Sequence, residues 1–394
     1  MAFRDRLRRK QKLTHRCSLR RLFEDAWKCV EIAPAPRGRR RKDLNSTKSP
    51  GTGVGDAARP VENLGQSAVH AATAEQIERA AQLLHAGALI AFPTETVYGL
   101  GADARNADAV RRIFAAKGRP AEHPVIVHLT SADLMPRWAR EIDASAQALA
   151  RAFWPGPLTL ILPRAATVLD VVTGGQDSVG LRVPGHPVAQ ALLARLLDLG
   201  GDGIAAPSAN RFGRISATNA RHVAEEFGDA VAMVLDGGSS RHGIESTIVD
   251  LTSGEPALLR PGAITVEALG RVLGAAPRLP SSQSPRASGT LASHYAPQTA
   301  ARLIAPHELI QALSTLTKPV ARIAVLARSV AKPAEFSGSW IDAPRESAAY
   351  ARQLYATLRA LDTRGADEIW IETPPDGPDW VAVNDRLRRA THRQ

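Results

Sequence analysis

Two cations flank a glycine where a predicted helix gives way to a buried strand. Residues 115–129 read AAKGRPAEHPVIVHL, with Lys117 and Arg119 on either side of the glycine and His128 near the end of the apolar run. Glycine lets the chain leave a helix, and the proline after Arg119 prevents its return. Arginine can hold a phosphate with two parallel hydrogen bonds, and lysine supplies a compact charge. The stretch therefore predicts an anion site, although cations at a helix C-terminus also complement the helix dipole, which would explain Lys117 alone.

Further polar loops follow predicted strands. PTETVYGLG (93–101) comes after the apolar run ALIAF, and APSAN (206–210) comes after GIAA. GIESTIVD (243–250) places hydroxyls where a strand starts, LLRPG (258–262) ends a strand with a cation, and HYAP (294–297) supplies an aromatic ring. Open α/β sheets bind ligands at the carboxyl ends of their strands. Each loop alone is equally explained as a polar turn, but together they suit a nucleotide plus a small polar molecule.

Several common catalytic motifs are absent from the sequence. There is no GxxxxGK[ST] phosphate loop, and GLG at 99–101 lacks the third glycine of a dinucleotide fingerprint. HExxH, GxSxG and the kinase motifs are also missing. An enzyme with this sequence therefore uses none of the common phosphate or nucleophile motifs.

The elements that must position these loops predict an α/β fold. Thr73 and Gln76 have the spacing of a capping box, and apolar residues follow at helical spacing until Gly87. Asn106 is placed to cap a second helix, which ends at KGRP. Strands are predicted at 88–92, 124–129, 158–162, 179–183, 203–206, 230–235 and 246–251, with helices between them, notably at 188–197 and 219–227. Strands that alternate with helices indicate an α/β class.

Composition divides the chain into segments. Residues 279–293 are rich in Ser and Pro, which is typical of a linker. Predicted strands at 322–327 and 367–373, with a helix at 346–361, indicate a second, smaller α/β unit after it. We therefore predict a larger domain at 61–275, a linker at 276–297 and a C-terminal α/β domain at 298–394.

The excess positive charge is confined to the first 60 residues. That segment holds 17 Lys and Arg against 6 Asp and Glu, whereas the remaining residues hold 33 of each. The net charge of +11 therefore says nothing about the partners of the larger part. Three interpretations of residues 1–60 stay open: a disordered tail, a translated upstream region or targeting peptide, and an arm that contacts RNA or a membrane.

Length and apolar content limit the classes of protein to which the chain can belong. The 394 residues, 44% of them hydrophobic, suffice for two domains with substantial cores. No apolar run approaches the roughly 20 residues that cross a bilayer, and no secretory signal is visible. Cys17 and Cys29 are the only cysteines, so the rest of the sequence offers neither a disulfide framework nor a cysteine zinc site. We expect a cytoplasmic protein without a membrane partner.

Seven motifs occur in the order that is typical of one family. They are PTETVYGLGADA, KGRPAEHPVIVHL, FWPGPLTLIL, LRVPGHP, APSAN, DGG with ESTIVD, and LLRPG. In these motifs the chain resembles the YrdC-like threonylcarbamoyl-AMP synthases, and HYAP with the smaller α/β unit resembles their longer, two-domain version. The resemblance covers about residues 61–394. It implies a twisted open sheet with flanking helices around a concave cationic cavity, plus a Rossmann-like C-terminal domain.

The resemblance implies a nucleotidyltransferase reaction. The amine of L-threonine captures bicarbonate or CO2 as a carbamate, and a carbamate oxygen attacks the α-phosphorus of ATP. The products are threonylcarbamoyl-AMP and pyrophosphate, and downstream proteins transfer the threonylcarbamoyl group to adenosine 37 of ANN-reading tRNAs. Mg2+ is expected with ATP, held largely by phosphates and water, and no organic prosthetic group is expected.

The resemblance also implies roles for individual residues. Lys117 and Arg119 are expected to hold the triphosphate and to stabilise charge during transfer. The threonine pocket is expected to contain Thr96, His128, Arg182 and Ser246, with Arg182 on the carboxylate. The ATP site is expected to contain Arg119, His123, Ser178, Ala206, Ser208, Asn210, Ser216, Arg260 and Tyr295, with Tyr295 as a lid residue that excludes water.

Two positions depart from the family pattern. His123 stands where the family more often has Asn, and an imidazole is wider than an amide and titrates near neutrality. Its role at the nucleotide is therefore in doubt. Ser178 stands where Thr is frequent, a change that keeps the hydroxyl.

Two alternative functions are retained. One is a related enzyme that forms a carbamoyl adenylate with another acceptor. The carbamoyl transferases of hydrogenase maturation carry such a domain, but they usually add cysteine clusters, which this chain lacks. The other is a protein that binds double-stranded RNA or tRNA through residues 1–60, and such binding falls steeply as salt rises.

Overall fold

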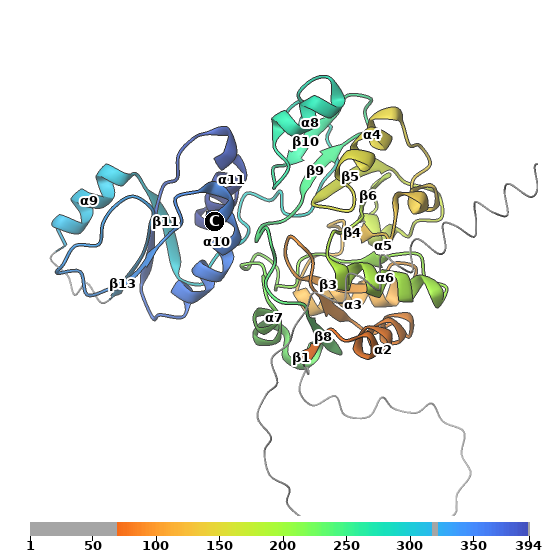
Figure 1. Cartoon of the computed structure of the whole chain (residues 1–394), viewed down its shortest axis with the longest axis horizontal. Coiled ribbons are helices and arrows are strands. Elements are labelled where there is room, and N and C mark those ends of the chain that lie inside the picture. Colours follow the sequence, from red (N-terminus) through yellow and green to blue (C-terminus); the bar gives the residue numbers. More distant parts are fainter. Residues whose placement is uncertain (1–68, 317–321, 393–394) are drawn as a thin grey trace, which may run out of the picture. The chain divides into compact units, whose positions relative to one another are not determined.

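The computed structural model describes residues 69–316 and 322–392, all of which belong to one compact unit within residues 61–394. The basic segment 1–60 lies outside the described residues. These residues form two β-sheets, each flanked by helices (Figure 1). None of the described helices is both long enough and apolar enough to cross a membrane.

The larger sheet has ten strands in the order β1-β8-β2-β3-β7-β4-β6-β5-β9-β10. It is mixed, because β4 pairs with β6 and β5 with β9 in parallel, whereas β2 with β3 and β5 with β6 are antiparallel. Its strands are β1 (Val69–Ala71), β2 (Ile90–Phe92), β3 (Gly99–Asp103), β4 (Ile126–His128), β5 (Leu158–Pro163), β6 (Ser178–Arg182), β7 (Ile204–Ala205), β8 (Met233–Asp236), β9 (Thr247–Asp250) and β10 (Ala257–Arg260).

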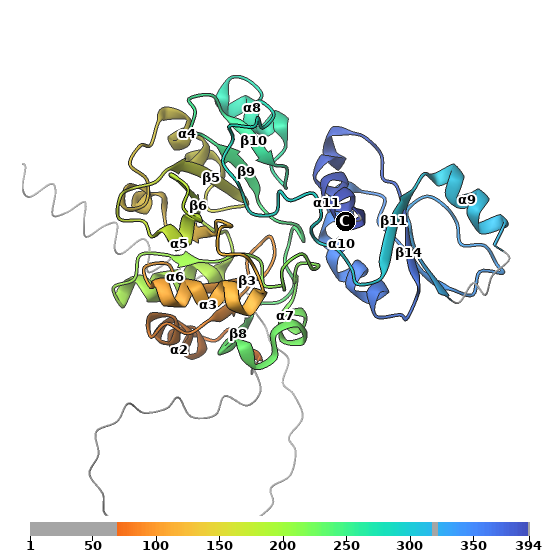
Figure 2. The ribbon, with the colours of Figure 1, turned by 180° about the vertical axis from the view of Figure 1, so that it is seen from behind.

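Helices connect these strands and cover both faces of the sheet. α2 and α6 lie side by side on one face, where their apolar residues meet Ile90 and Phe92 (Figure 2). The helical segments of this part are α2 (Ala74–His85), α3 (Ala107–Lys117), η1 (Ala132–Arg137), α4 (Ala144–Phe153), α5 (Asp170–Thr173), α6 (Pro187–Asp198), α7 (Ala220–Phe227), η2 (Gly228–Ala230) and α8 (Val266–Leu273).

The smaller sheet is entirely parallel and has the order β11-β14-β12-β13. Parallel strands need crossover connections. Helices lie in the connections from β11 to β12 and from β13 to β14, whereas the described connection from β12 to β13 contains no helix. The strands are β11 (Ala300–Ile304), β12 (Ile323–Ala327), β13 (Ser339–Asp342) and β14 (Glu368–Glu372). The helical segments are α9 (Pro306–Ser314), α10 (Ser347–Asp362), η4 (Pro378–Trp380) and α11 (Val381–Thr391).

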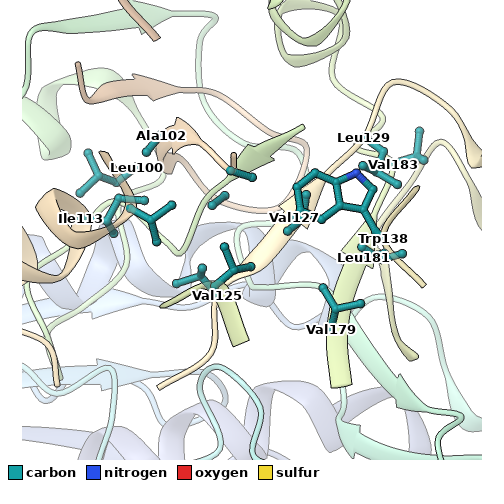
Figure 3. Close-up of a cluster of buried hydrophobic side chains, with 14 of the residues drawn as sticks. Leu100, Ala102, Ile113, Val125, Val127, Leu129, Trp138, Val179, Leu181 and Val183 are labelled. Atoms are coloured by element: carbon teal, nitrogen blue, oxygen red, sulfur yellow. The ribbon is translucent and has the colours of Figure 1, made fainter. Parts of the chain in front are cut away.

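Alternation along the central strands separates a core face from a polar face. Val127 of β4 and Leu181 of β6 are fully buried in one apolar cluster, together with Ile113 of α3 (Figure 3). Successive strand side chains point to opposite faces. The neighbours of these residues, His128 and Arg182, therefore lie on the other face of the same strands, and the packed core fixes their position.

The structure confirms the predicted α/β class, and two local details differ from the sequence analysis. Asn106 caps α3 as predicted, since its side chain accepts a hydrogen bond from the Ala109 amide at 3.0 Å. Thr73 accepts from the Gln76 amide, but Gln76 Oε1 has no partner, so only half of the predicted capping box forms. Residues 99–103, interpreted as part of a loop, form strand β3, because their glycines fit closely against neighbouring side chains.

Gly101 of β3 provides a test of this close packing. A Cβ at that position would lie 2.8 Å from both Ile204 Cγ2 and Phe92 Cε1. We expect Gly101→Ala to lower the free energy of unfolding by about 1–3 kcal/mol, the usual cost of overpacking, in urea denaturation. Gly270→Ala in α8 is the control, because its Cβ makes ordinary contacts at 3.5 Å and alanine favours a helix by about 0.5–1 kcal/mol. Equal effects of the two substitutions would contradict the packing explanation.

Candidate active site

Neighbouring strands carry polar side chains on the face opposite the apolar cluster. β4 and β6 pair in a register that places His128 opposite Arg182. β5, on the other side of β6, contributes Thr159, whose hydroxyl lies 2.8 Å from that of Ser246 just before β9. The sheet therefore brings together polar groups that are far apart in the sequence.

A small cavity of about 30 Å³ lies at this face. Eight of the predicted site residues line it: Thr96, His128, Arg182, Ala206, Ser208, Ser246, Arg260 and Tyr295. The described residues thus do not show an open concave cationic cavity of the expected kind.

Arg182 is buried and paired with a carboxylate. Its Nη2 donates to Glu95 Oε1 at 2.6 Å, and the Gly185 amide donates to Glu95 Oε2 at 3.0 Å. Burial raises the pKa of Glu95, but the charge and hydrogen bond of Arg182 outweigh it, so this pKa lies below its ordinary value. The Nε of Arg182 donates to the Gly156 carbonyl at 3.3 Å, so among its contacts with the described residues Nη1 is the nitrogen left for a ligand.

His128 is a neutral imidazole in this setting. It is buried, its ring meets that of Phe92 edge-on, and its Nδ1 has no hydrogen-bond partner among the described residues. Burial and the charge of Arg182 lower the pKa of His128 to about 3. An unpartnered polar atom in a dry site costs free energy, so Nδ1 is a ready position for a ligand.

Arg260 connects the start of β9 to the linker. Its Nε and Nη2 donate to the carbonyl and hydroxyl of Ser246 at 3.0 and 3.1 Å, and its Nη1 donates to the Ser288 carbonyl at 2.7 Å. Ser288 also lies 3.5 Å, through its hydroxyl, from Nη1 of Arg119. The two guanidinium groups therefore converge on one linker residue.

The KGRP cations Lys117 and Arg119 do not line this cavity. Lys117 Nζ donates to the Ser208 carbonyl at 2.6 Å and to the Asn210 carbonyl, so it anchors the APSAN loop. Arg119 Nη2 donates to the Pro124 carbonyl at 2.9 Å, and its Nε has no partner among the described residues. Gly118 ends α3 in the left-handed conformation, with φ of 62°. This turn places both cations beside the loop.

Three buried cations lack a carboxylate partner within the described part of the chain: Lys117, Arg119 and Arg260. Burial lowers the pKa of each, and for Arg119, near the charge of Arg260, the value falls to about 10. Uncompensated buried charge is costly. The natural compensation is an anionic ligand.

Tyr295 of the linker is buried in the wall of the cavity. The residue is 1% exposed, with φ of 62°, and its hydroxyl donates to the Gly289 carbonyl at 3.4 Å. Its ring lies 4.2 Å from that of His294 and 5.5 Å from that of Tyr355 in α10. Its position agrees with the predicted lid role, which stays a prediction.

The other predicted residues surround the cavity without all lining it. Ser178 lines a neighbouring small cavity with Ile126 and Ile161. Asn210 donates to the carbonyls of two residues that follow it. His123 is partly exposed, with its ring 5.4 Å from that of Phe212. Ser216 is fully buried and donates to Glu245 Oε1 at 2.5 Å.

Sequence reasoning did not single out two glutamates. Glu95 lies within PTETV and Glu245 within GIESTIVD, and both are buried beside arginines. The available signal was an acidic residue flanked by hydroxyls inside each predicted ligand loop. This signal does not point to the glutamates, because an anion-binding site predicts cationic side chains and not the carboxylates that pair with those cations.

The arrangement suits two kinds of ligand. Arg182, a neutral His128 and nearby hydroxyls can bind a small molecule that carries a carboxylate and a hydroxyl. The unpaired cations can bind a polyphosphate. Among the residues placed by the structure, no group of three or more His, Cys, Asp or Glu side chains could hold a metal ion.

Two family models match consecutive parts of the chain. The Sua5–YciO–YrdC model, whose description reads "Telomere recombination", matches residues 82–262. The model described as "Threonylcarbamoyl-AMP synthase, C-terminal domain" matches residues 264–391. Together they cover most of the described chain.

Curated relatives and solved structures agree with these matches. A threonylcarbamoyl-AMP synthase of Pyrococcus abyssi is 38% identical over 329 residues, which span 80% of this chain and 94% of the relative. One from Bacillus subtilis is 37% identical over 325 residues, spanning 80% of this chain and 92% of the relative. The crystal structure of P. abyssi Sua5 complexed with L-threonine has a TM-score of 0.75 and 37% identity, and the match covers 81% of this chain and 95% of that one.

The buried Glu95–Arg182 pair yields a stability prediction. Glu95→Gln leaves Arg182 buried without a counter-charge, and breaking such a pair costs about 3–5 kcal/mol. Glu95→Gln/Arg182→Met removes both charges and is expected to recover part of this loss in urea unfolding. A double variant less stable than the single one would contradict the expected coupling.

Glu245 yields a pH prediction. Burial raises its pKa, but the charges of Arg386 and Arg260 and the Ser216 hydrogen bond lower it to about 2, from an ordinary 4.5. A pKa depressed by folding adds stability above the unfolded value and loses it as pH falls. The stability advantage of the wild type over Glu245→Gln should therefore shrink as pH falls from 4.5 towards 2, by roughly 3 kcal/mol in all.

Urea unfolding at successive pH values measures this difference. The exposed Glu225→Gln serves as the matched control, and its curve should run parallel to that of the wild type. A constant difference between wild type and Glu245→Gln across the acid range would refute the assigned pKa direction.

Proposed function

Because the chain belongs to the threonylcarbamoyl-AMP synthase family, we propose that it forms threonylcarbamoyl-AMP and pyrophosphate from L-threonine, bicarbonate or CO2, and ATP. The threonine amine adds to CO2 to give a carbamate. A carbamate oxygen then displaces pyrophosphate from the α-phosphorus. The site must therefore hold a small zwitterion beside a polyanion, and it must keep water from the labile carbamate.

The proposal that the site binds ATP depends on one observation. Three buried cations without carboxylate partners in the described chain contact one linker segment and one loop. Arg119 and Arg260 converge on Ser288, and Lys117 holds the APSAN loop. An ATP triphosphate would supply the missing negative charge. Phosphoryl transfer depends mainly on positioning and charge stabilisation, which these groups can provide.

The proposal that the site binds L-threonine is based on Arg182 and its neighbours. We assign Nη1 of Arg182 to the threonine carboxylate. Thr96, His128 and Ser246 line the same cavity and offer hydroxyls and a neutral imidazole to the rest of the molecule. A neutral His128 adds no repulsion towards the threonine ammonium before that amine loses its proton.

The remaining nucleotide contacts are proposed on weaker support. Ala206 and Ser208 line the cavity, and Tyr295 would lie over the bound nucleotide. Ser178, Asn210, Ser216 and His123 are assigned to ATP by the resemblance alone. Mg2+ would enter with the phosphates and supply further charge neutralisation, with its remaining ligands from water.

Wider aspects of the function also remain proposals. The product would pass to proteins that transfer the threonylcarbamoyl group to tRNA in the cytoplasm. We retain the division into a catalytic domain (61–275), a linker (276–297) and a C-terminal domain (298–394). An RNA contact through residues 1–60 lies outside the described chain.

Pyrophosphate release tests the reaction. The full chain is incubated with ATP and Mg2+, with and without L-threonine and bicarbonate. Release that requires both substrates supports the proposal. Release that ignores threonine would indicate a carbamoyl-adenylate-forming enzyme with another acceptor. No release from folded protein would favour a binding protein.

Arg119→Ala tests the phosphate role. Loss of a charged donor to the transferring phosphoryl group typically costs about 10²–10³-fold in rate, and we expect kcat/KM for ATP to fall by about that factor. Arg111→Ala is the matched control, because Arg111 lies on α3, the helix that ends just before Arg119, with a side chain 63% exposed. If kcat/KM fell equally little in both variants, Arg119 would not act on the phosphates.

A further inference from the structure

The helix α11 places a fully buried arginine against the base of the candidate site. The Arg386 side chain is 0% exposed, and its Nε donates to Glu245 Oε2 at 2.8 Å. Its Nη2 donates to the Pro261 carbonyl at 3.0 Å and lies 3.4 Å from the Glu245 carbonyl. These contacts join the part of the chain that carries the smaller sheet to the loops of the larger one.

The two backbone contacts have a specific location. Glu245 directly precedes Ser246, and Pro261 directly follows Arg260. One guanidinium thus clamps the chain next to a residue assigned to threonine and next to a residue assigned to ATP. The clamped segments are close together, since a Cβ on Gly262 would meet the Thr247 amide nitrogen at 2.4 Å.

Glu245 itself would compete with the nucleotide for cations. Its Oε1 accepts from Ser216, and its Oε2 accepts from Tyr355 at 2.9 Å in addition to Arg386. After Arg386, Arg260 is the positive charge that acts most strongly on this carboxylate. Without Arg386, a buried carboxylate would attract Arg260 and repel a triphosphate.

Arg386 also supports the lid residue. Its Cζ lies 5.4 Å from the centre of the Tyr295 ring, in a cation–π arrangement. Tyr355 of α10 contacts the same ring and donates to Glu245. The smaller unit therefore reaches both the base of the site and the linker that covers it.

From these contacts, and resting on the proposed function, we propose that Arg386 is a positioning residue for the reaction. It neutralises Glu245, which keeps the charge of Arg260 available to ATP. Arg386 acts through these residues and touches neither substrate. This gives α11 a defined task in nucleotide binding.

Steady-state kinetics of the full chain test the proposal. We expect Arg386→Met to raise KM for ATP at least tenfold, because Arg260 turns to Glu245. KM for threonine should change by no more than about threefold, because the Glu95–Arg182 pair holds that pocket independently. Arg388→Met is the matched control, since Arg388 lies on the same helix and is exposed, and its side chain donates to the Asn384 carbonyl of its own helix. It should leave both constants unchanged.

The double variant separates positioning from mere folding. Glu245→Gln/Arg386→Met removes the competing carboxylate together with its partner, so KM for ATP should return to within about threefold of the wild type. A double variant as impaired as Arg386→Met, or an unchanged KM in Arg386→Met, would overturn the proposal. If Arg386→Met does not fold, the double variant is compared with the wild type alone. A KM for ATP more than about threefold above the wild-type value then overturns the proposal.

Failure of the proposed function gives a different result. In that case the wild type itself releases no threonine-dependent pyrophosphate. Calorimetric titration with ATP then makes the same comparison without turnover. A tenfold weaker Kd in Arg386→Met, restored in the double variant, supports the positioning role, and equal Kd values in all variants refute it.

Discussion

Buried charge is the constraint on which this site depends. Two buried arginines are neutralised within the fold: Arg182 by Glu95, and Arg386 by Glu245 and Asp385. Three other cations, Lys117, Arg119 and Arg260, have no such partner in the described chain. A protein tolerates unpaired buried cations when a ligand supplies the counter-charge, since desolvation otherwise disfavours the charged form. The carboxylates thus distinguish two kinds of cation: those neutralised within the fold, and those left without a carboxylate partner in the described chain.

The sheet fixes where the polar side chains of the site lie. The apolar cluster on one face fixes Val127 and Leu181, and the pleat then fixes His128 and Arg182 on the other face. Loops that begin or end at β3, β7, β9 and β10 add the remaining groups. No single loop forms the site, which explains why each motif alone resembled an ordinary polar turn.

Much of this could be predicted from the sequence, for identifiable reasons. Apolar runs and caps such as Asn106 signal local structure directly, and the strands β4, β5, β6 and β9 were predicted within a few residues. β3 was missed because its glycines depress strand propensity, whereas close packing against Phe92 and Ile204 requires them. Glu95 and Glu245 were missed because their role depends on partners 87 and 141 residues away. The intervening chain gives no local sign of such pairs.

The backbone of Tyr295 has a consequence for how the site fills. A non-glycine residue with φ of 62° is strained, typically by about 1–3 kcal/mol, and packing holds it there. In the lid role proposed for Tyr295, this strain would offset part of the favourable packing of the ring, and it would narrow the free-energy gap between the closed and the open arrangement. Apparent affinity scales with the population of the competent state. A strained lid residue would thus admit substrate at a smaller loss of apparent affinity than a relaxed one.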